Sequence, residues 1–242
     1  MVSGNIAKIG YFGILTMPLN LMEKVSFVVP IYNEKENIES LCNAIGEAMD
    51  PTSHPYEIIL VNDGSSDGTW QEIERISEAR KTLIGIDLVT NYGQSSALSA
   101  GIDQAGGELI VLMDGDMQND PADVPMMIRT LKEQDCDVVS GERVKRKDSV
   151  ITRRVPSRIA NFFIRLITGV KLRDYGCALR VFRSEIARNL GLYGELHRFI
   201  PVLAVLQGAR MVQVPVQHHR RSRNHTHNSS TTIRINRVQR NY

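Results

Sequence analysis

The sequence predicts an α/β fold in which helices cover both faces of a mostly parallel central sheet. Along the first 145 residues, short apolar stretches alternate with longer amphipathic stretches, the pattern of strands joined by crossover helices. The apolar stretches are nearly continuous, as in strands buried on both faces. Of the 242 residues, 42% are hydrophobic and 23% charged, which is typical of a globular domain. We expect one large core with extensions.

The first part of the core is expected to contain three strands, each followed by a helix. Ile38, Leu41 and Ile45 share one face of the first helix, and Asp67 is a candidate N-cap for the second. Pro30 is expected to end the hydrogen-bond ladder of the first strand, because proline has no N–H. In chain order, the six elements are expected at residues 24–33, 34–49, 56–64, 67–80, 83–91 and 93–105.

The second part continues the alternation and then becomes less regular. Pro121 fits the first turn of a helix, with Asp120 as its cap. After residue 145 the periodicity weakens, and from Arg220 onward no period is visible. Strands are expected at 107–116, 136–144, 177–183 and 210–219, and helices at 121–134, 158–170 and 194–208.

Polar residues follow three of the expected strands, at the point where each strand ends. These clusters are Tyr32–Asn33–Glu34, Asp63–Gly64–Ser65 and Asp114–Gly115–Asp116. In open parallel sheets, ligands bind beyond the carboxyl ends of the strands. The three clusters therefore indicate a binding site at one edge of the sheet.

The stretch DGDMQNDP, from Asp114 to Pro121, suggests a divalent cation. Asp114 and Asp116 place two carboxylates near one point, and Gln118 can add an amide oxygen. Mg²⁺ is usually held by one or two carboxylates together with substrate phosphates. The plainer interpretation is an acidic turn before a helix, and the residues alone leave the two open.

The other two clusters fit a nucleoside site but also fit ordinary turns. Tyr32 could stack on a base, Glu34 could bond a ribose or start a helix, and Asp63 could accept from a base or ribose. Gly64 and Gly68 permit close backbone approach, but Asp-Gly is also common turn chemistry.

Taken together, VVPIYNEKENI, VNDGSSDGT and MDGDMQNDP resemble the nucleotide-sugar-binding domain of glycosyltransferase family 2, which has a GT-A fold. DGDMQNDP and NYGQSSALSAGIDQAGGELI resemble the polyprenyl-phosphate branch, which includes dolichyl-phosphate mannose synthases and undecaprenyl-phosphate sugar transferases. Gln94 stands where that branch usually has lysine. SGERVKRKD, DYGCALRVFR and GELHRFIP extend the resemblance to about residue 217.

The resemblance implies a division of the chain and a role for each matching residue. Residues 1–23 would be an extension, 24–217 the catalytic domain, and 218–242 a basic tail. Within the catalytic domain, 24–145 would bind the nucleotide sugar and 146–217 would form the acceptor side.

The resemblance also implies a role for each matching residue. Donor-binding residues would be Pro30, Tyr32, Glu34, Asp63, Asp114 and Gln118. The metal, Mg²⁺ or Mn²⁺, would be held by Asp114, Asp116 and Gln118. Catalytic residues would include Asp116, Arg143, Asp174 and Arg220, and the acceptor phosphate would meet Arg154, Arg158 and Arg221.

The implied reaction is metal-dependent, inverting transfer of a hexose from a nucleotide sugar to a polyprenyl phosphate. A lipid monophosphate is already largely ionised near neutral pH, so its attack needs little help from a base. Asp174 stands where family members with hydroxyl acceptors keep a base, and here it is expected to orient an arginine instead. A UDP-hexose donor is slightly favoured over GDP-mannose, and homo-oligomerisation is left open.

Two other functions stay open: a family 2 enzyme with a saccharide hydroxyl acceptor, and a non-catalytic binding protein on the same fold. The second would use its basic tail on lipid or nucleic acid. Residues 196–242 carry eight arginines, no lysine and no acidic residue, so with a net charge of +2 overall the rest of the chain carries −6. The leading hypothesis needs no nucleic acid partner. The tail also lacks the Gly-x-Ser-Lys usual in the polyprenyl-phosphate branch, so acceptor binding is less secure than donor binding.

The expected location is the cytoplasmic face of a membrane, with peripheral attachment. No apolar run reaches the roughly 18 to 20 residues that span a bilayer. The stretch 153–170 mixes arginines with Phe162, Phe163 and Ile167, and could lie on an anionic membrane surface or pack on the sheet.

The cysteines suggest reduced thiols, because Cys42, Cys136 and Cys177 are odd in number and far apart.

Overall fold

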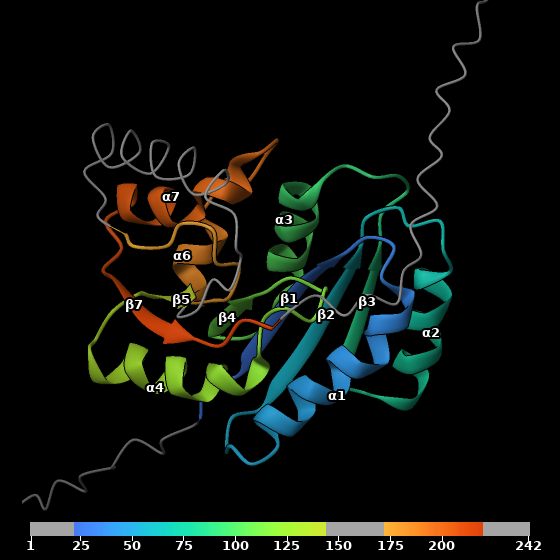
Figure 1. The fold of residues 1–242 in the computed structure, drawn as a ribbon, viewed down its shortest axis with the longest axis horizontal. Helices are drawn as coiled ribbons and strands as arrows, with labels where there is room; N and C mark the ends of the chain where they lie inside the picture. Colours follow the sequence, from blue (N-terminus) through green and yellow to red (C-terminus); the bar gives the residue numbers. More distant parts are fainter. Residues whose placement is uncertain (1–21, 144–171, 220–242) are drawn as a thin grey trace, which may run out of the picture.

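The computed structural model describes residues 22–143 and 172–219. It has a central sheet of seven strands with helices on both faces (Figure 1). The strands are β1 (Val25–Ile31), β2 (Tyr56–Asn62), β3 (Leu83–Asp87), β4 (Leu109–Leu112), β5 (Val138–Arg143), β6 (Arg180–Arg183) and β7 (Met211–Val216). The predicted α/β class is confirmed.

The sheet is parallel except for one inserted strand. Its order is β3-β2-β1-β4-β6-β5-β7. β1 pairs in parallel with β2 and β4, β2 with β3, and β5 with β7. β6 is antiparallel to both of its neighbours, β4 and β5. The sequence predicted the strand at 177–183 but not its direction, which depends on pairing with residues far along the chain.

Two helical layers bury the two faces of the sheet. α1 (Ile38–Met49), α2 (Thr69–Ala79) and α4 (Val124–Glu133) pack over one face. α3 (Gln94–Gln104), α6 (Ser184–Arg188) and α7 (Ile200–Leu206) cover the other (Figure 1). Alternate residues of β1 enter the two layers: Phe27 and Val29 face α1, whereas Val28 faces α3.

Several predicted elements are shorter than the sequence suggested, or are subdivided. The polar ends of the expected strands at 83–91 and 107–116 are loops, because β3 ends at Asp87 and β4 at Leu112. A 3-10 turn, Lys35–Asn37, precedes α1, a second one, Pro121–Asp123, precedes α4, and a third, Leu196–Phe199, precedes α7. The short helix α6 was not predicted. The helix expected at 158–170 lies outside the described residues.

Two N-cap residues were predicted, Asp120 and Asp67, and one of them is confirmed. Asp120 is the N-cap of the turn at Pro121, where its Oδ1 accepts the N–H of Ala122 at 2.9 Å, as predicted. Gly68, and not Asp67, is the N-cap residue of α2. Asp67 nevertheless accepts the N–H of Thr69 at 3.0 Å, so it caps the helix from one position earlier.

The prediction that Pro30 ends the hydrogen-bond ladder of the first strand is wrong for the pairing with β2. Pro30 lies inside β1, in register with Val61 of β2, and the ladder continues to Ile31. The ladder between β1 and β4 ends at Val28, so Pro30 occupies a part of the strand that is paired on one side only. A proline is tolerated there because no partner on the β4 side requires its N–H.

The three cysteines are free and buried, as the sequence suggested. Within the described residues, no helix combines the length and the apolar character needed to cross a membrane.

Close packing of α3 on the sheet depends on Gly101. A Cβ at this position would lie 3.1 Å from Cγ2 of Val61 and still closer to Cγ1 of Val28. We therefore expect Gly101→Ala to lower the free energy of unfolding by about 1–3 kcal/mol, the usual cost of overpacking a core. Urea denaturation would measure this loss.

Ser99→Ala is the matched control, since it also introduces alanine into α3, at a half-buried position. Its expected effect is small because alanine favours helices. Equal stability of Gly101→Ala and Ser99→Ala would show that α3 packs more loosely than described.

Candidate active site

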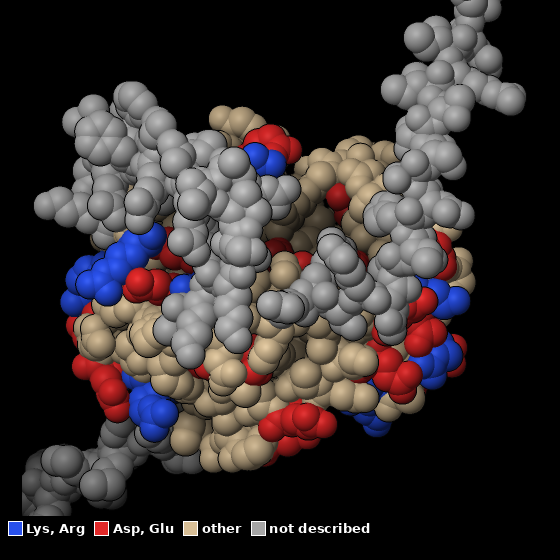
Figure 2. All heavy atoms as spheres, in the orientation of Figure 1, with Lys and Arg blue, Asp and Glu red and all other residues tan. Residues whose placement is uncertain are grey.

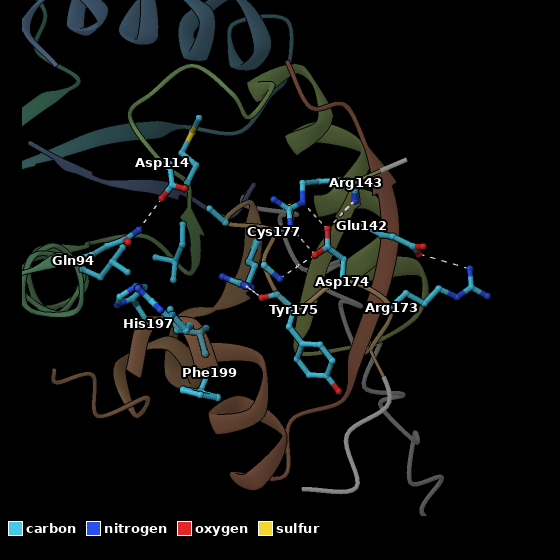
Figure 3. Close-up of a pocket in the computed structure, with 18 residues that line it drawn as sticks. Gln94, Asp114, Glu142, Arg143, Arg173, Asp174, Tyr175, Cys177, His197 and Phe199 are labelled. Carbon is cyan, nitrogen blue, oxygen red and sulfur yellow. Dashed lines mark hydrogen bonds and ion pairs between the residues drawn. The ribbon is translucent and has the colours of Figure 1, made fainter. Parts of the chain in front are cut away.

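The loop after β4 carries the two carboxylates of the predicted metal site. Asp114 accepts a hydrogen bond from the side-chain amide of Gln94, with Nε2 and Oδ1 2.8 Å apart (Figure 3). Asp116 accepts the backbone N–H of Gln118 at 3.1 Å, and Met117 between them has a φ of +61°. Gly115 brings this loop against β1, because any Cβ there would collide with Ile31.

The electrostatics of this loop suit a cation. Burial and, after it, the neighbouring Asp116 carboxylate raise the pKa of Asp114 to about 6, while Arg180 and Gln94 oppose the shift. A divalent cation, which prefers oxygen ligands, would relieve the cost of keeping Asp114 ionised in this loop.

The described residues alone offer an incomplete set of ligands. No group of three or more His, Cys, Asp and Glu side chains in the described ranges is arranged to hold a metal. Among these residues, Asp114 and Asp116 would hold Mg²⁺ or Mn²⁺ together with oxygens from a substrate. That arrangement is usual for Mg²⁺, which takes few carboxylates and several phosphate or water oxygens.

The predicted third ligand, Gln118, is placed beside the last described residue. Its backbone C=O accepts the N–H of His219 at 2.9 Å, and its side-chain amide lies 3.5 Å from the carbonyl of His219. His219 also contacts Asp120, with Nε2 and Oδ2 2.9 Å apart. The segment after β7 is thus fastened to the loop after β4.

Arg143 and Asp174 form a two-point ion pair. Nε of Arg143 lies 2.7 Å from Oδ2 of Asp174, and the terminal nitrogen lies 2.8 Å from Oδ1 (Figure 3). Only 14% and 13% of the two side chains are exposed. Burial alone would raise the pKa of Asp174, but its bonds to Arg143 and to the Gly176 N–H hold it below its usual range. Asp174 is therefore an ionised, weakly basic carboxylate.

A pocket of about 610 Å³ connects Asp114 with the Arg143–Asp174 pair (Figure 3). It lies at the end of β4 and the start of β6, with Gln94, His197 and Phe199 along one side and the Arg143–Asp174 pair along the other (Figure 3). Its charged lining is four arginines and three acids: Arg143, Arg173, Arg180, Arg198, Asp114, Glu142 and Asp174. On the described residues visible in Figure 2, acidic and basic side chains are interspersed.

A serine–histidine contact holds one wall of this pocket. Oγ of the buried Ser95, in α3, accepts the backbone N–H of His197 at 3.0 Å and lies 3.1 Å from Nδ1 of the same residue. Burial lowers the pKa of His197, so the ring is neutral at neutral pH. The contact fixes the turn before α7 against the start of α3.

The predicted nucleoside residues lie apart from this pocket, at the ends of β1 and β2. Asp63 is buried and accepts the backbone N–H groups of Tyr92 and Gly93 at 2.7 and 3.0 Å. It thereby fixes the entry to α3. Glu34 is buried and accepts from the side chain of Asn37 at 2.5 Å, whereas Tyr32 is half exposed and Pro30 lies one residue before the end of β1.

The sequence-based set is therefore divided. Asp114, Arg143 and Asp174 line the pocket, while Asp116 and Gln118 lie in the adjoining loop and do not line it. Arg154, Arg158, Arg220 and Arg221 lie outside the described residues.

The structure adds Gln94, Arg180 and His197 to the residues that line the pocket. Gln94 stood out in the sequence only as a departure from lysine. Side chains alternate along the strand expected at 177–183, so Arg180 lies on the same face as Phe182. This alternation could have indicated from the sequence that Arg180 faces the interior.

Comparison with known proteins gives one family and one fold. The profile of glycosyl transferase family 2 matches residues 26–191. A dodecaprenyl-phosphate galacturonate synthase of Rhizobium johnstonii is 42% identical over 207 residues, which cover 84% of this chain and 61% of that protein. An undecaprenyl-phosphate 4-deoxy-4-formamido-L-arabinose transferase of Yersinia enterocolitica is 38% identical over 198 residues, covering 81% of this chain and 60% of that protein. The chain thus spans about three fifths of the length of these relatives.

Solved structures share the fold at low identity. A mannosyltransferase from Pyrobaculum calidifontis, in complex with GDP-Man and Mn²⁺, superposes with a TM-score of 0.59 at 21% identity, covering 81% of this chain and 56% of that one. A glucosyl-3-phosphoglycerate synthase from Mycobacterium tuberculosis, in complex with UDP, gives a TM-score of 0.61 at 21% identity, covering 82% and 72%.

The ion pair in the pocket makes a prediction about stability. Asp174→Asn would leave the guanidinium of Arg143 without its counter-charge, and we expect the free energy of unfolding at pH 7 to fall by about 3 kcal/mol. Because the pKa of Asp174 is depressed in the folded protein, its contribution is fully present above the ordinary aspartate pKa of about 4. It is lost as the pH falls further, so the difference between wild type and Asp174→Asn should shrink only below about pH 4.

Glu142→Gln is the control for this measurement. Glu142 lies 3.7 Å from Arg173, whose side chain is 81% exposed. Exposed pairs contribute about 1 kcal/mol or less. If urea denaturation showed the same small loss of unfolding free energy for both variants, the Arg143–Asp174 pair would not stabilise this part of the fold.

Proposed function

Since this chain belongs to glycosyl transferase family 2, we propose that it transfers a sugar from a nucleotide-sugar donor to a polyprenyl phosphate. Two named relatives at 42% and 38% identity act on dodecaprenyl and undecaprenyl phosphates, which supports the acceptor class. The observation that carries the proposal is the state of Asp174.

Asp174 is held in a way that suits an ionised acceptor. A hydroxyl acceptor needs a general base, and an efficient base has a pKa near the working pH. Both oxygens of Asp174 are engaged by Arg143, and the pKa of the carboxyl is lowered. A phosphate monoester is already anionic near neutral pH and needs no such base. Asp174 then acts by positioning Arg143, as the sequence suggested.

The donor is proposed to lie across the ends of β1, β2 and β4. Tyr32, Glu34 and Asp63 would face the nucleoside, and Asp114 and Asp116 the diphosphate. The fit of these two carboxylates to a cation supports Mg²⁺ or Mn²⁺, and one solved structure of similar fold holds Mn²⁺ with GDP-Man. When bound, the ion would neutralise charge on the departing nucleoside diphosphate.

The remaining chemistry is positioning and charge stabilisation. A phosphate oxygen of the acceptor attacks C1 of the sugar, and the bond from C1 to the donor diphosphate breaks, with inversion as expected for such enzymes. Arg143, fixed by Asp174, points its charge into the pocket where two anionic substrates must come together. Arg154, Arg158, Arg220 and Arg221 are further candidates for the phosphates.

The transferred sugar can be something other than a simple hexose. One relative is named for galacturonate and another for a formamido-arabinose. A UDP-linked sugar remains our preference over GDP-mannose. Because the acceptor is a lipid, we also propose that the protein works as a peripheral protein at the cytoplasmic face of a membrane.

The test is a transfer assay with matched acceptors. The full chain, Mn²⁺ and radiolabelled UDP- and GDP-sugars would be incubated with vesicles containing undecaprenyl phosphate or undecaprenol. We expect label only in the phosphate-bearing lipid. Arg143→Gln should reduce the rate at least about 100-fold, because it removes charge stabilisation of the transition state. Asp174→Asn should retain measurable transfer.

Asp103→Asn is the control, since Asp103 is exposed on α3 away from the pocket. Complete loss of transfer in Asp174→Asn, with donor binding intact, would instead assign Asp174 as a base for a hydroxyl acceptor. Donor binding without transfer to either lipid would contradict the proposed activity for this chain.

A further inference from the structure

Arg180 is a buried arginine at the floor of the pocket whose hydrogen bonds are incomplete. It lies within the sheet, in register with Leu112 of β4 and Ser140 of β5, and only 4% of the residue is exposed. One terminal nitrogen donates to the carbonyl of Tyr175 at 3.1 Å. Within the described ranges, Nε has no hydrogen-bond partner and the side chain forms no ion pair.

Ser140 adds a second unused polar group at the same place. It is fully buried, and its Oγ has no hydrogen-bond partner in the described part of the chain. Residues directly opposite each other on antiparallel strands project on the same side of the sheet. Arg180 and Ser140 therefore present a charged and a neutral donor side by side.

A buried charge without a counter-ion is costly. Removing a guanidinium from water costs several kcal/mol unless an anion compensates for it. The other arginines that line the pocket already have acidic partners: Arg143 has Asp174, Arg173 has Glu142, and Arg198 has Glu195. Asp114 and Asp174 act on Arg180 electrostatically, but neither forms an ion pair with it. Within the described ranges, Arg180 is thus a lining arginine whose charge has no ion-pair partner.

We infer that Arg180 forms an anion-binding site in the pocket and receives an oxyanion carried by a substrate; Ser140 lies beside it in the sheet but does not line the pocket. The site differs from the proposed diphosphate site in its residues, because Asp116 and Gln118 do not line this pocket, although Asp114 does. This inference rests on the proposed function, because it takes the ligand to be a substrate of the transfer reaction. The oxyanion is either the phosphate of the lipid acceptor or a carboxylate on the transferred sugar.

The surroundings of Arg180 fit such a ligand. Leu98, Phe199 and Ile200 line the same pocket, so apolar carbon can lie beside the anion. The pocket of about 610 Å³ is large enough for a head group with part of a sugar or prenyl chain. A guanidinium that is already fixed by the sheet binds an oxyanion with little loss of side-chain entropy.

The test is calorimetric titration of the full chain with pairs of probes that differ by one anionic group. The acceptor arm compares geranyl phosphate with geraniol. The donor arm, with Mn²⁺ present, compares UDP-galacturonate with UDP-galactose, or GDP-mannuronate with GDP-mannose if GDP is the nucleotide bound. We expect wild type to prefer the anionic member of at least one pair by about tenfold or more. Arg180→Gln should reduce that preference to nearly one.

Two further variants separate binding from folding. Arg180→Lys keeps a positive charge but loses the guanidinium, so it should fold and retain only part of the preference. Arg129→Gln removes an exposed arginine of α4 and should leave every titration unchanged. If Arg180→Gln fails to fold, a reduced preference in Arg180→Lys decides.

Each outcome has one meaning. Loss confined to the phosphate pair assigns the site to the acceptor, and loss confined to the uronate pair assigns it to the sugar. An unchanged preference in Arg180→Gln, or in Arg180→Lys where Arg180→Gln fails to fold, would overturn the inference, as would no preference in wild type. Failure of UDP and GDP to bind would count against the proposed function, while the geranyl phosphate pair would still test Arg180.

Discussion

The ion pair between Arg143 and Asp174 is the interaction on which the arrangement of the pocket depends. It joins the end of β5 to the loop before β6, two segments 31 residues apart in the chain. It also keeps Asp174 ionised and a poor base, and it gives Arg143 a fixed direction. Arg143 shares the pocket with Asp114 and with Arg180, whose side chain forms no ion pair within the described residues.

The position of β6 explains why these groups meet. Inserted antiparallel between β4 and β5, it places Arg180 in the row of Leu112 and Ser140, just below the point where β4 turns into the Asp114 loop. Gln94 reaches the same loop from the start of α3, and Asp63 fixes that start through two backbone N–H groups. The end of β2 and the pocket are thereby connected through the residues at the start of α3.

Sequence reasoning located the strand ends well because parallel strands place their carboxyl ends at one edge whatever the details of packing. Asp63 and Asp114 were placed at strand ends in this way, whereas Arg143 was named only through the family resemblance. The direction of β6 and the burial of Arg180 were not predicted, since both depend on pairing between residues 40 and more positions apart, such as Ser140 and Arg180 or Leu112 and Arg180. Pro30 was misjudged for a similar reason: whether its missing N–H matters depends on where the neighbouring ladder ends.

The most direct test of the account is the position of Mn²⁺ in crystals of the full chain grown with UDP or GDP, located by anomalous scattering. The account predicts one strong peak within about 2.5 Å of a carboxylate oxygen of Asp114 or Asp116, bridged to the diphosphate of the nucleotide. A nucleotide bound with its diphosphate at Arg180, or Mn²⁺ bound away from the loop after β4, would contradict it.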